Sequence, residues 1–510
     1  MSQHDTYLTL VPGGLYDVAV EWLQAQLTPQ WHLETRLMAS RPLASPPPKK
    51  QHAHLVETCC PPAVDVATFS HPQYSQNVSV GYHGDKPVWT QAGATFMIWM
   101  RVETNAPVSV VASLRGPGPW LAWVGGWPVD LPMDDTPESY VPRIAQVLTH
   151  DEGFTKALDL WRRFALSSSW EKRMPAEQRS RILQGNDFLK YRISCMREDS
   201  KRYSYNRQDF VKAIAGSILP SSCENWKVDL TNYDVEVVLL VKNQSYLAMA
   251  LTLQPFQLVT SKNFGNGSLP PDLLAPLPDF APQDVTRLRT SNAQLLLQLC
   301  QLQPGEVLLD PCVGVGTLAA EASRVVSLGG DLVLTADGLG SVAAAMSRSQ
   351  QPGPDLLCAW DASVLPIRNG SVDVICSDLP FGHQCMSAAK VQALLPLLVA
   401  EMARVLRPST GRMVLLCGSY AHVLEALIFC QKELPRKEGA SGGGTLWKFP
   451  CTAVFPVNIG GISAWIVMIS RGDALWEHER LMQRIRKQVA KRQLVLKQQA
   501  GIKKKKRLQA

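Results

Sequence analysis

The stretch EVLLDPCVGVGT, from Glu306 to Thr317, decides the fold class of the second half of this chain. An apolar run typical of a buried strand leads into a glycine-rich turn, and apolar residues at helical spacing follow it. Gly314 and Gly316 lack a Cβ, so the backbone of this turn allows a ligand to approach closely at the start of a helix. The stretch therefore predicts a strand, a ligand-binding turn and a helix.

Strand-like and helix-like segments alternate downstream of this turn. The strand-like segments are LVLTAD at 332–337, VDVICSD at 372–378 and MVLLCGSY at 413–420. Such alternation is typical of a parallel, doubly wound sheet, which binds ligands at the carboxyl ends of its strands. The expected fold class of residues 285–472 is therefore α/β.

Acidic residues recur in order at or near the ends of these strands. The Asp310 carboxylate would repel the pyrophosphate of a dinucleotide. It would instead suit the positively charged ammonium group of S-adenosylmethionine. Asp337 can accept hydrogen bonds from ribose hydroxyls, and Asp361 follows where an adenine amino group would be read. The expected cofactor is therefore S-adenosylmethionine. Its expected binding residues are Asp310, Gly314, Gly316, Thr317, Asp337 and Asp361.

The same turn permits a second interpretation. GVGTLA fits the G-x-G-x-x-A fingerprint of dinucleotide-binding enzymes, and Asp337 follows at about the expected distance. An NAD-dependent oxidoreductase is therefore an alternative.

The second informative stretch is SDLPFG, at 377–382. An exocyclic base amine is a poor nucleophile because its lone pair is delocalised into the ring. The Asp378 carboxylate and the Leu379 carbonyl are acceptors that can draw its N–H groups aside and direct the lone pair at a methyl group. Pro380 would fix the turn, and Phe381 would stack on the base. These four residues are the expected catalytic set, with a simple strand-capping turn as the structural alternative.

The first half of the chain predicts a different kind of module. YLTLVPGG and LYDVAVEWLQAQL, within 7–27, predict a strand, a turn and a helix. From residue 187, LKYRISC, RQDFVKAIAGSIL, WKVDLTNYDVEVVLLV and SYLAMALTL predict a strand, a helix and two further strands. The proline-rich segment 268–284 predicts a linker.

Cations interleaved with tyrosines lie at the start of this α+β segment, between residues 187 and 212. Lys and Arg contact phosphates, and aromatic rings stack on unpaired bases, so the pattern favours RNA binding. A solvated strand and hairpin is the structural alternative. The expected RNA-binding residues are Lys190, Arg192, Arg197, Lys201, Arg202 and Arg207.

Composition narrows the function classes. The chain has 510 residues, a net charge of +7 and 12 cysteines without a CxxC pair, which argues against a zinc site and a disulfide framework. No apolar run reaches the roughly 18 residues of a membrane helix, and no signal peptide is visible. No acid follows Glu479, whereas eleven Lys and Arg lie between Arg484 and Arg507. This tail favours phosphate contact or a nuclear address, and a solvated tail is the alternative.

DPCVGVGT, WDASVLP and SDLPFG resemble the motifs of class I, S-adenosylmethionine-dependent amino-methyltransferases. WKVDLTNYDVEVVLLV resembles a THUMP domain, an RNA-binding module. The combination is similar to the THUMP-domain-containing guanosine-N2 RNA methyltransferases, over roughly residues 187–470 and faintly over 1–40. The resemblance implies a Rossmann-like methyltransferase domain preceded by an α+β THUMP and ferredoxin-like RNA-binding region. The expected ranges are 1–165 (ferredoxin-like, with insertions), 166–267 (THUMP), 268–284 (linker), 285–472 (methyltransferase) and 473–510 (basic tail).

The resemblance also implies a substrate and a partner. Guanosine-N2 methylation of U6 small nuclear RNA is slightly favoured over tRNA, and a small zinc-containing activator subunit is expected. The expected location is the nucleus, with the cytoplasm as a second site.

The sequence departs from the family's motifs at several positions. Leu379 stands in place of the commoner Pro, and His383–Gln384 stand where the family has a cation. The helix after Asp337 lacks the family's usual asparagine. A non-catalytic RNA-binding adaptor is the alternative from another class, and the presence of Asp310, Asp378 and Phe381 argues against it.

Overall fold

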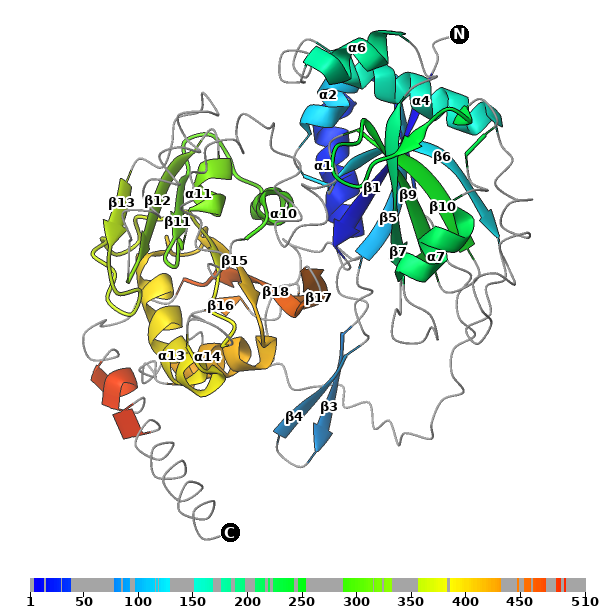
Figure 1. Ribbon diagram of the computed structural model, residues 1–510. Coiled ribbons are helices and arrows are strands. Elements are labelled where there is room, and N and C mark those ends of the chain that lie inside the picture. The colour runs from blue at the N-terminus through cyan, green and yellow to red at the C-terminus, as the bar shows by residue number, and fades with distance from the viewer. Residues whose placement is uncertain are drawn as a thin grey trace, which may run out of the picture. The chain divides into compact units, whose positions relative to one another are not determined.

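Figure 1 shows a computed structural model of the chain. It describes residues 4–12, 15–28, 30–37, 78–83, 86–91, 97–114, 116–117, 119–128, 151–167, 176–184, 189–197, 207–215, 219–220, 223–242, 246–253, 288–314, 316–322, 325–332, 356–382, 386–432, 447–448, 454–459, 462–473, 483–487 and 490–491. The chain divides into two compact units. Unit 1 comprises Met1–Gln51 and Phe96–Ala275, and unit 2 comprises His52–Thr95 and Pro276–Ala510.

Unit 1 is an α+β structure. Its strands are β1 (Asp5–Pro12), β2 (Leu33–Leu37), β5 (Met97–Thr104), β6 (Trp120–Pro128), β7 (Lys190–Arg197), β8 (Lys227–Val228), β9 (Val235–Lys242) and β10 (Tyr246–Thr252). Its helices are α1 (Tyr16–Leu27), α2 (Val108–Ser113), α4 (Asp151–Ala165), α6 (Ala176–Gln184) and α7 (Arg207–Ile214). The strands form one sheet in the order β2-β5-β1-β6-β10-β9-β7-β8.

The sheet of unit 1 is continuous across the expected domain boundary at residue 165. The antiparallel pair of β6 and β10 joins strands from the two sides of this boundary. Tyr7 and Trp120 are fully buried, and their rings meet edge to face with centroids 6.0 Å apart. The expected linker 268–284 lies outside the described residues, and the domain ranges stay predictions.

A separate hairpin of β3 (Val78–His83) and β4 (Lys86–Gln91) forms a two-stranded antiparallel sheet.

Within the part of the chain that the structure describes, no helix has the length and apolar character needed to span a bilayer.

Unit 2 contains the alternating pattern that the sequence predicted. Its strands are β11 (Val307–Asp310), β12 (Val326–Asp331), β13 (Leu356–Ala359), β14 (Val374–Asp378), β15 (Arg412–Cys417), β16 (Trp447–Lys448), β17 (Val454–Ile459) and β18 (Ile462–Arg471). Its helices are α10 (Thr290–Cys300), α11 (Thr317–Glu321), α13 (Ala388–Val405) and α14 (Tyr420–Lys432). The main strand order is β13-β12-β11-β14-β15-β18-β16, and β17 pairs with β18.

The five strands from β13 to β15 are parallel, and β18 runs antiparallel to β15. The chain starts at β11, moves outward to β13, and then returns to the other side of β11 at β14. The carboxyl ends of β11 and β14 therefore meet at the switch point of the sheet, where open α/β sheets bind ligands. The expected α/β fold class is confirmed.

The second strand of this sheet corrects one expectation. LVLTAD at 332–337 was expected to lie beside β11, but the strand there is β12, which ends at Asp331. The acid that ends the second strand is thus Asp331. Asp337 lies outside the described residues.

Two glycines explain why β12 is difficult to recognise. Glycine is depleted in strands, so VSLGGD has a weak strand signal. The packing nevertheless requires small residues here. A Cβ on Gly330 would lie 2.2 Å from the Trp360 ring, and a Cβ on Gly329 would lie 2.7 Å from Val313 Cγ2.

Helices cover both faces of the sheet in unit 2. Figure 1 shows α10 and α11 together on one side, and α13 and α14 together on the other. An apolar cluster of this unit contains Val405 of α13, Leu427 of α14 and Ile469 of β18. Ile485, in a helical turn at 483–487, is fully buried in the same cluster. The core thus includes a residue from the segment expected to be a tail.

Candidate active site

Asp310 and Ser377 are brought together by the pairing of β11 with β14, in which Leu309 lies opposite Ile375. Ser377 Oγ donates a hydrogen bond of 2.7 Å to Asp310 Oδ1. The backbone N–H of Cys312 donates to the same oxygen at 3.2 Å. Because Asp310 is 3% exposed and Ser377 is 0% exposed, these bonds fix a buried carboxyl group at the switch point.

Both acids at the switch point have unusual protonation behaviour. Burial raises the pKa of Asp310 to about 7, although the hydrogen bonds from Ser377 and Cys312 oppose the rise. Burial also raises the pKa of Asp378 to about 7, and the charge of Asp310 adds to that rise. Two neighbouring carboxyl groups that are reluctant to ionise together suit a cationic ligand, which would stabilise both charges.

The glycine turn is open on its outer side. Gly314 and Gly316 have φ values of 52° and 78°, a region that favours glycine. A Cβ built on Gly314 would meet no atom within 4 Å, so the backbone there is accessible to a ligand. Asp331 Oδ2 accepts a hydrogen bond of 3.0 Å from Gly314 N–H and ties the turn to the end of β12. Thr317 begins α11 directly after the turn.

Trp360 connects the loops that follow the first three strands. Its backbone N–H donates to the Asp331 carbonyl at 3.0 Å, and its indole N–H donates to the Pro311 carbonyl at 3.1 Å. Asp361 follows and is exposed. Its Oδ1 accepts hydrogen bonds from the Ser363 N–H at 2.8 Å and the Ser363 hydroxyl at 2.7 Å. The loop that carries Asp361 is therefore placed beside the end of β12.

The SDLPFG stretch continues β14 at the same edge. Asp378 is the last residue of the strand and is half-buried. The Leu379 N–H donates to the Leu416 carbonyl at 2.9 Å, which prolongs the contact with β15. Gly382 has φ 85°, and a Cβ there would lie 2.6 Å from Ala388 Cα. Glycine is therefore needed to turn the chain from this stretch into α13.

Gly418 packs closely against Phe381. A Cβ on Gly418 would lie 3.2 Å from the Phe381 carbonyl oxygen and 3.3 Å from Phe381 Cβ and Cγ. Such contacts are tighter than ordinary van der Waals separations, so a larger residue would displace Phe381. The loop after β15 therefore positions Phe381, while Pro380 is half-buried beside it.

The expected RNA-binding residues of unit 1 are placed unevenly. Lys190, Arg192 and Arg197 lie on β7, Arg207 begins α7, and Lys201 and Arg202 lie outside the described residues.

Two of these cations already have partners within the fold. Arg192 Nε donates to Glu236 Oε1 at 2.9 Å, and its guanidinium lies 4.2 Å from the Tyr233 ring centroid. Lys190 Nζ lies 3.2 Å from Asp229 Oδ2. Any RNA contact by these two residues would have to share or replace these pairings.

Three residues of this site were not predicted from the sequence. Asp331 lies in a glycine-rich strand with a weak signal, and Gly418 acts through a contact between distant segments. Ser377 stood within the quoted SDLPFG stretch, where a hydroxyl beside a strand-end acid was the available signal. Among the residues that the structure describes, no group of three His, Cys, Asp or Glu side chains could hold a metal ion.

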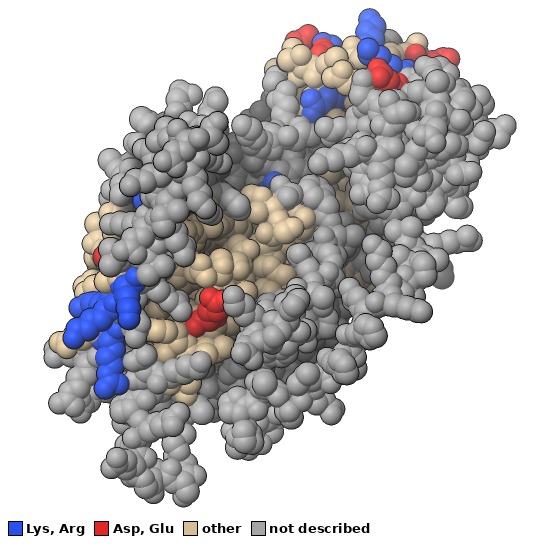
Figure 2. Space-filling view, turned by 90° about the horizontal axis from the view of Figure 1, so that it is seen from below, with Lys and Arg blue, Asp and Glu red and all other residues tan. Residues whose placement is uncertain are grey.

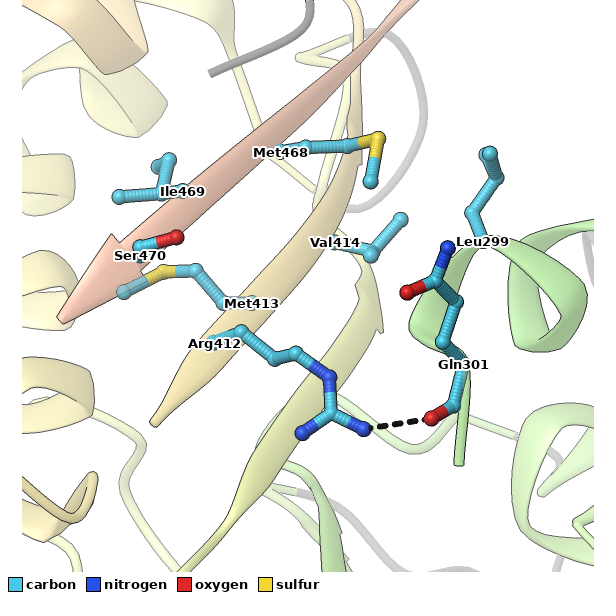
Figure 3. A pocket seen from close by; sticks show the side chains of 8 residues that line it. All are labelled: Leu299, Gln301, Arg412, Met413, Val414, Met468, Ile469 and Ser470. Carbon is cyan, nitrogen blue, oxygen red and sulfur yellow. Dashed lines mark hydrogen bonds between the residues drawn. The ribbon is translucent and has the colours of Figure 1, made fainter. Parts of the chain in front are cut away.

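A small pocket of unit 2 lies away from these acids. Figure 3 shows it lined by Leu299, Gln301, Arg412, Met413, Val414, Met468, Ile469 and Ser470. Arg412, the first residue of β15, donates a hydrogen bond of 2.9 Å to the Gln301 carbonyl. The pocket therefore lies toward the amino ends of the strands. Its volume of about 30 Å³ would hold about two water molecules and is too small for a nucleoside.

Residues 344–441 match the family model described as the RMKL-like methyltransferase domain. This range contains β13, β14, β15 and the SDLPFG stretch. The match confirms the expectation of a methyltransferase domain in unit 2.

Relatives are found among RNA-modifying enzymes. The chain is 29% identical over 316 residues to "tRNA (guanine(6)-N(2))-methyltransferase THUMP3" of Bos taurus, covering 59% of this chain and 55% of the relative. It is 26% identical over 243 residues to "U6 snRNA (guanine-N(2))-methyltransferase THUMPD2" of Mus musculus, covering 47% and 40%. The chain thus spans about half the length of the relatives that it matches. The resemblance found from the sequence motifs is confirmed.

Among solved structures, TrmN from Thermus thermophilus is similar with a TM-score of 0.49 and 16% identity, covering 92% of this chain and 100% of that one.

Proposed function

We propose that this chain, which is related to the THUMP-domain guanosine-N2 RNA methyltransferases, methylates the exocyclic amine of a guanosine in a small structured RNA. One observation supports this most: the glycine turn after β11 and the SDLPFG acid that ends β14 lie at adjoining strand ends. A cofactor site and a site for a base amine are thereby adjacent.

The residues at this edge fit S-adenosylmethionine. That cofactor supplies an electrophilic methyl group on a positively charged sulfonium. The open backbone at Gly314 gives room for it, and the Asp310 carboxylate suits its ammonium group. Asp331 takes the ribose role first assigned to Asp337, because it is the acid that ends β12. Gly316, Thr317 and Asp361 complete the proposed cofactor set.

Asp378 serves the attacking amine. Its carboxylate accepts an amine N–H, and the backbone carbonyl of Leu379 accepts the second one. When the amine took the methyl group, the methyl–sulfur bond would break and the sulfur would leave as a neutral thioether, so the amine nitrogen would become cationic and would have to lose a proton. A carboxyl group whose pKa is raised to about 7 by burial and by Asp310 is a competent acceptor for this proton near neutral pH. Phe381, held by Gly418, stacks on the base, and Pro380 keeps the turn rigid.

The substrate belongs to one of two classes. The two relatives are named for a tRNA and for the U6 small nuclear RNA, and both remain candidates for this chain. We propose that unit 1 grips the RNA and that the target base is flipped into the site of unit 2. A small zinc-containing activator subunit and a nuclear location, with the cytoplasm as a second site, belong to the same proposal.

The test uses the full chain, with and without a zinc-containing activator, and labelled S-adenosylmethionine. Separate reactions contain a tRNA pool and a U6 small nuclear RNA transcript, and the modified nucleotide is mapped. Incorporation into guanosine N2 of one of them is expected. RNA binding without any incorporation would favour the non-catalytic adaptor. S-adenosylmethionine should raise the melting temperature, and a rise with NAD alone would restore the oxidoreductase.

A further inference from the structure

The segment after β18 belongs to the core of unit 2. Ile485 lies in the helical turn 483–487 and is 0% exposed. It packs in the apolar cluster that also contains Val405, Leu427 and Ile469. This buried side chain anchors the turn 483–487 to the core of unit 2.

The outer side of the same segment is basic. Arg484, Arg486 and Lys487 are exposed, and Lys491 is exposed in the next described turn. Arg484 and Lys487 are three residues apart in one helical turn, so they share a side of it. Figure 2 shows Lys and Arg side chains gathered on the side of unit 2 where this segment lies in Figure 1. No Asp or Glu follows Glu479 in the sequence.

We propose that the exposed cations of the turns at 483–487 and 490–491, anchored to unit 2 by Ile485, form a contact surface for the phosphate backbone of the RNA substrate. The proposal rests on the proposed function, since it assumes that RNA is the substrate. Binding at such a surface gains free energy from the release of counterions. The buried Ile485 means that these cations are positioned before RNA binds, so less conformational entropy is lost than with a free tail.

The chemistry of the segment favours RNA over an acidic protein partner. Protein interfaces combine a buried apolar centre with charges of both signs at the rim. Here the apolar side chain of the turn faces its own core, and the exposed side carries cations. An exposed surface with cations but no acids among its described residues matches a polyanion of uniform charge. The surface therefore supplies affinity and orientation without reading sequence.

The position of the surface has a functional consequence. Because it is part of unit 2, the surface moves with Asp310 and Asp378 as one folded unit. It gives the catalytic unit its own hold on the RNA, separate from that of unit 1. The segment should therefore affect RNA affinity but leave cofactor affinity unchanged.

The test measures the affinity of the full-length protein for labelled tRNA and U6 transcripts at several salt concentrations. The double variant Arg486→Ala/Lys487→Ala removes two of the proposed phosphate contacts. The slope of log affinity against log salt concentration is negative, and its magnitude should decrease by about 1.4–1.8, since each phosphate contact contributes about 0.7–0.9. Arg368→Ala, at another exposed cation of unit 2, is the matched control and should leave the slope unchanged. Cofactor affinity and melting temperature should remain those of the parent protein in both cases.

Other outcomes overturn the proposal. An unchanged slope in the double variant means that the segment does not touch RNA. An equal fall in Arg368→Ala means that total charge, rather than this surface, is responsible. If poly-glutamate displaces RNA from the parent but not from the double variant, the surface binds acidic polymers in general. Methyl transfer by the parent protein is measured in parallel. If the parent protein transfers methyl groups and the variants bind RNA as it does, only the proposed surface is rejected. If the parent protein transfers no methyl groups, the proposed function is rejected.

Discussion

Buried acids occur in both units, but the acid of the candidate site is satisfied in a different way from the buried acids of unit 1. In unit 1, Arg181 pairs with Asp234 through bonds of 3.0 and 2.8 Å, and Arg192 pairs with Glu236 at 2.9 Å. In unit 2, a serine hydroxyl and a backbone N–H satisfy Asp310. These acids of unit 1 thus have fixed cations, as do Glu401 and Asp373 elsewhere in unit 2, which pair with Arg404 and Arg407. Asp310, in the candidate site, is held by hydrogen bonds from a hydroxyl and a backbone N–H instead.

The contrast separates acids that hold a fold from acids that serve a ligand. A buried carboxylate with an internal guanidinium keeps its charge and has little reason to bind another cation. A buried carboxyl without such a cation has a raised pKa and gains stability when a cationic ligand arrives. We infer that the Arg192–Glu236 pair locks strands β7 and β9 together and that Arg181 ties α6 to the residue before β9. Asp310 and Asp378 remain available for the cofactor and the base.

Breaking a pair in unit 1 should have the largest effect on stability. Arg192→Ala leaves the fully buried Glu236 without its guanidinium, which costs about 3–5 kcal/mol in buried ion pairs. The melting temperature of unit 1 should therefore fall strongly. Lys190→Ala is the matched control on the same strand, because its pair with Asp229 is more exposed and is worth about 0–1 kcal/mol. Equal melting temperatures for the two variants would show that Arg192 does not have this structural role.

Removing an acid of unit 2 should act on the reaction and spare the fold. Asp378→Ala should lower the single-turnover rate of methyl transfer a hundredfold or more, about 3 kcal/mol in the barrier, as for other preorganised polar groups. Melting temperature and cofactor affinity should change little, since the glycine turn and Asp310 are intact. Asp378→Asn keeps one acceptor oxygen and should retain partial activity. A stable Asp378→Ala variant with parental turnover would show that this residue only caps the strand.

The sequence predicted the parts of the site that are carried by short motifs. Strand, glycine turn and Asp310 are contiguous, and SDLPFG supplied Asp378 with its turn, so local pattern was sufficient. The predicted position of the second strand was wrong. The actual strand contains Gly329 and Gly330, which weaken its local signal but leave room for the side chains of Val313 and Trp360 from other segments. Contacts between residues far apart in the chain leave no local signal, which is also why Gly418 was missed.

The corrected second acid can be tested against the first assignment. Asp331→Ala removes the carboxylate that ends β12 and the acceptor for the Gly314 N–H. Cofactor affinity should fall about tenfold or more, because hydrogen bonds to charged groups contribute about 1.5–3 kcal/mol. Asp337→Ala is the matched control and should bind the cofactor like the parent. Calorimetric titration with S-adenosylhomocysteine measures both, and the opposite ranking would restore Asp337.

The smallest expected effect concerns Ser377, whose hydroxyl reaches Asp310 at 2.7 Å. This hydrogen bond lowers the pKa of Asp310 against the larger rise caused by burial. Its loss in Ser377→Ala should raise that pKa further, so the carboxyl group would ionise only at higher pH. The ammonium of the cofactor needs the ionised form, and affinity near pH 7 should fall several-fold, about 1 kcal/mol for one hydrogen bond.

The pH dependence distinguishes this electrostatic role from simple packing. In the parent protein, cofactor affinity should rise as the pH passes through about 7, where Asp310 loses its proton. In Ser377→Ala the midpoint of this rise should move to higher pH, and affinity well above the midpoint should approach the parental value. Ser377→Thr retains the hydroxyl and should restore the midpoint even if its extra methyl group lowers the melting temperature. A residue that only filled space would show the reverse pattern, with a lower melting temperature and an unmoved midpoint. Such a result would mean that Asp310 does not depend on its hydrogen bond from Ser377 as Glu236 of unit 1 depends on Arg192.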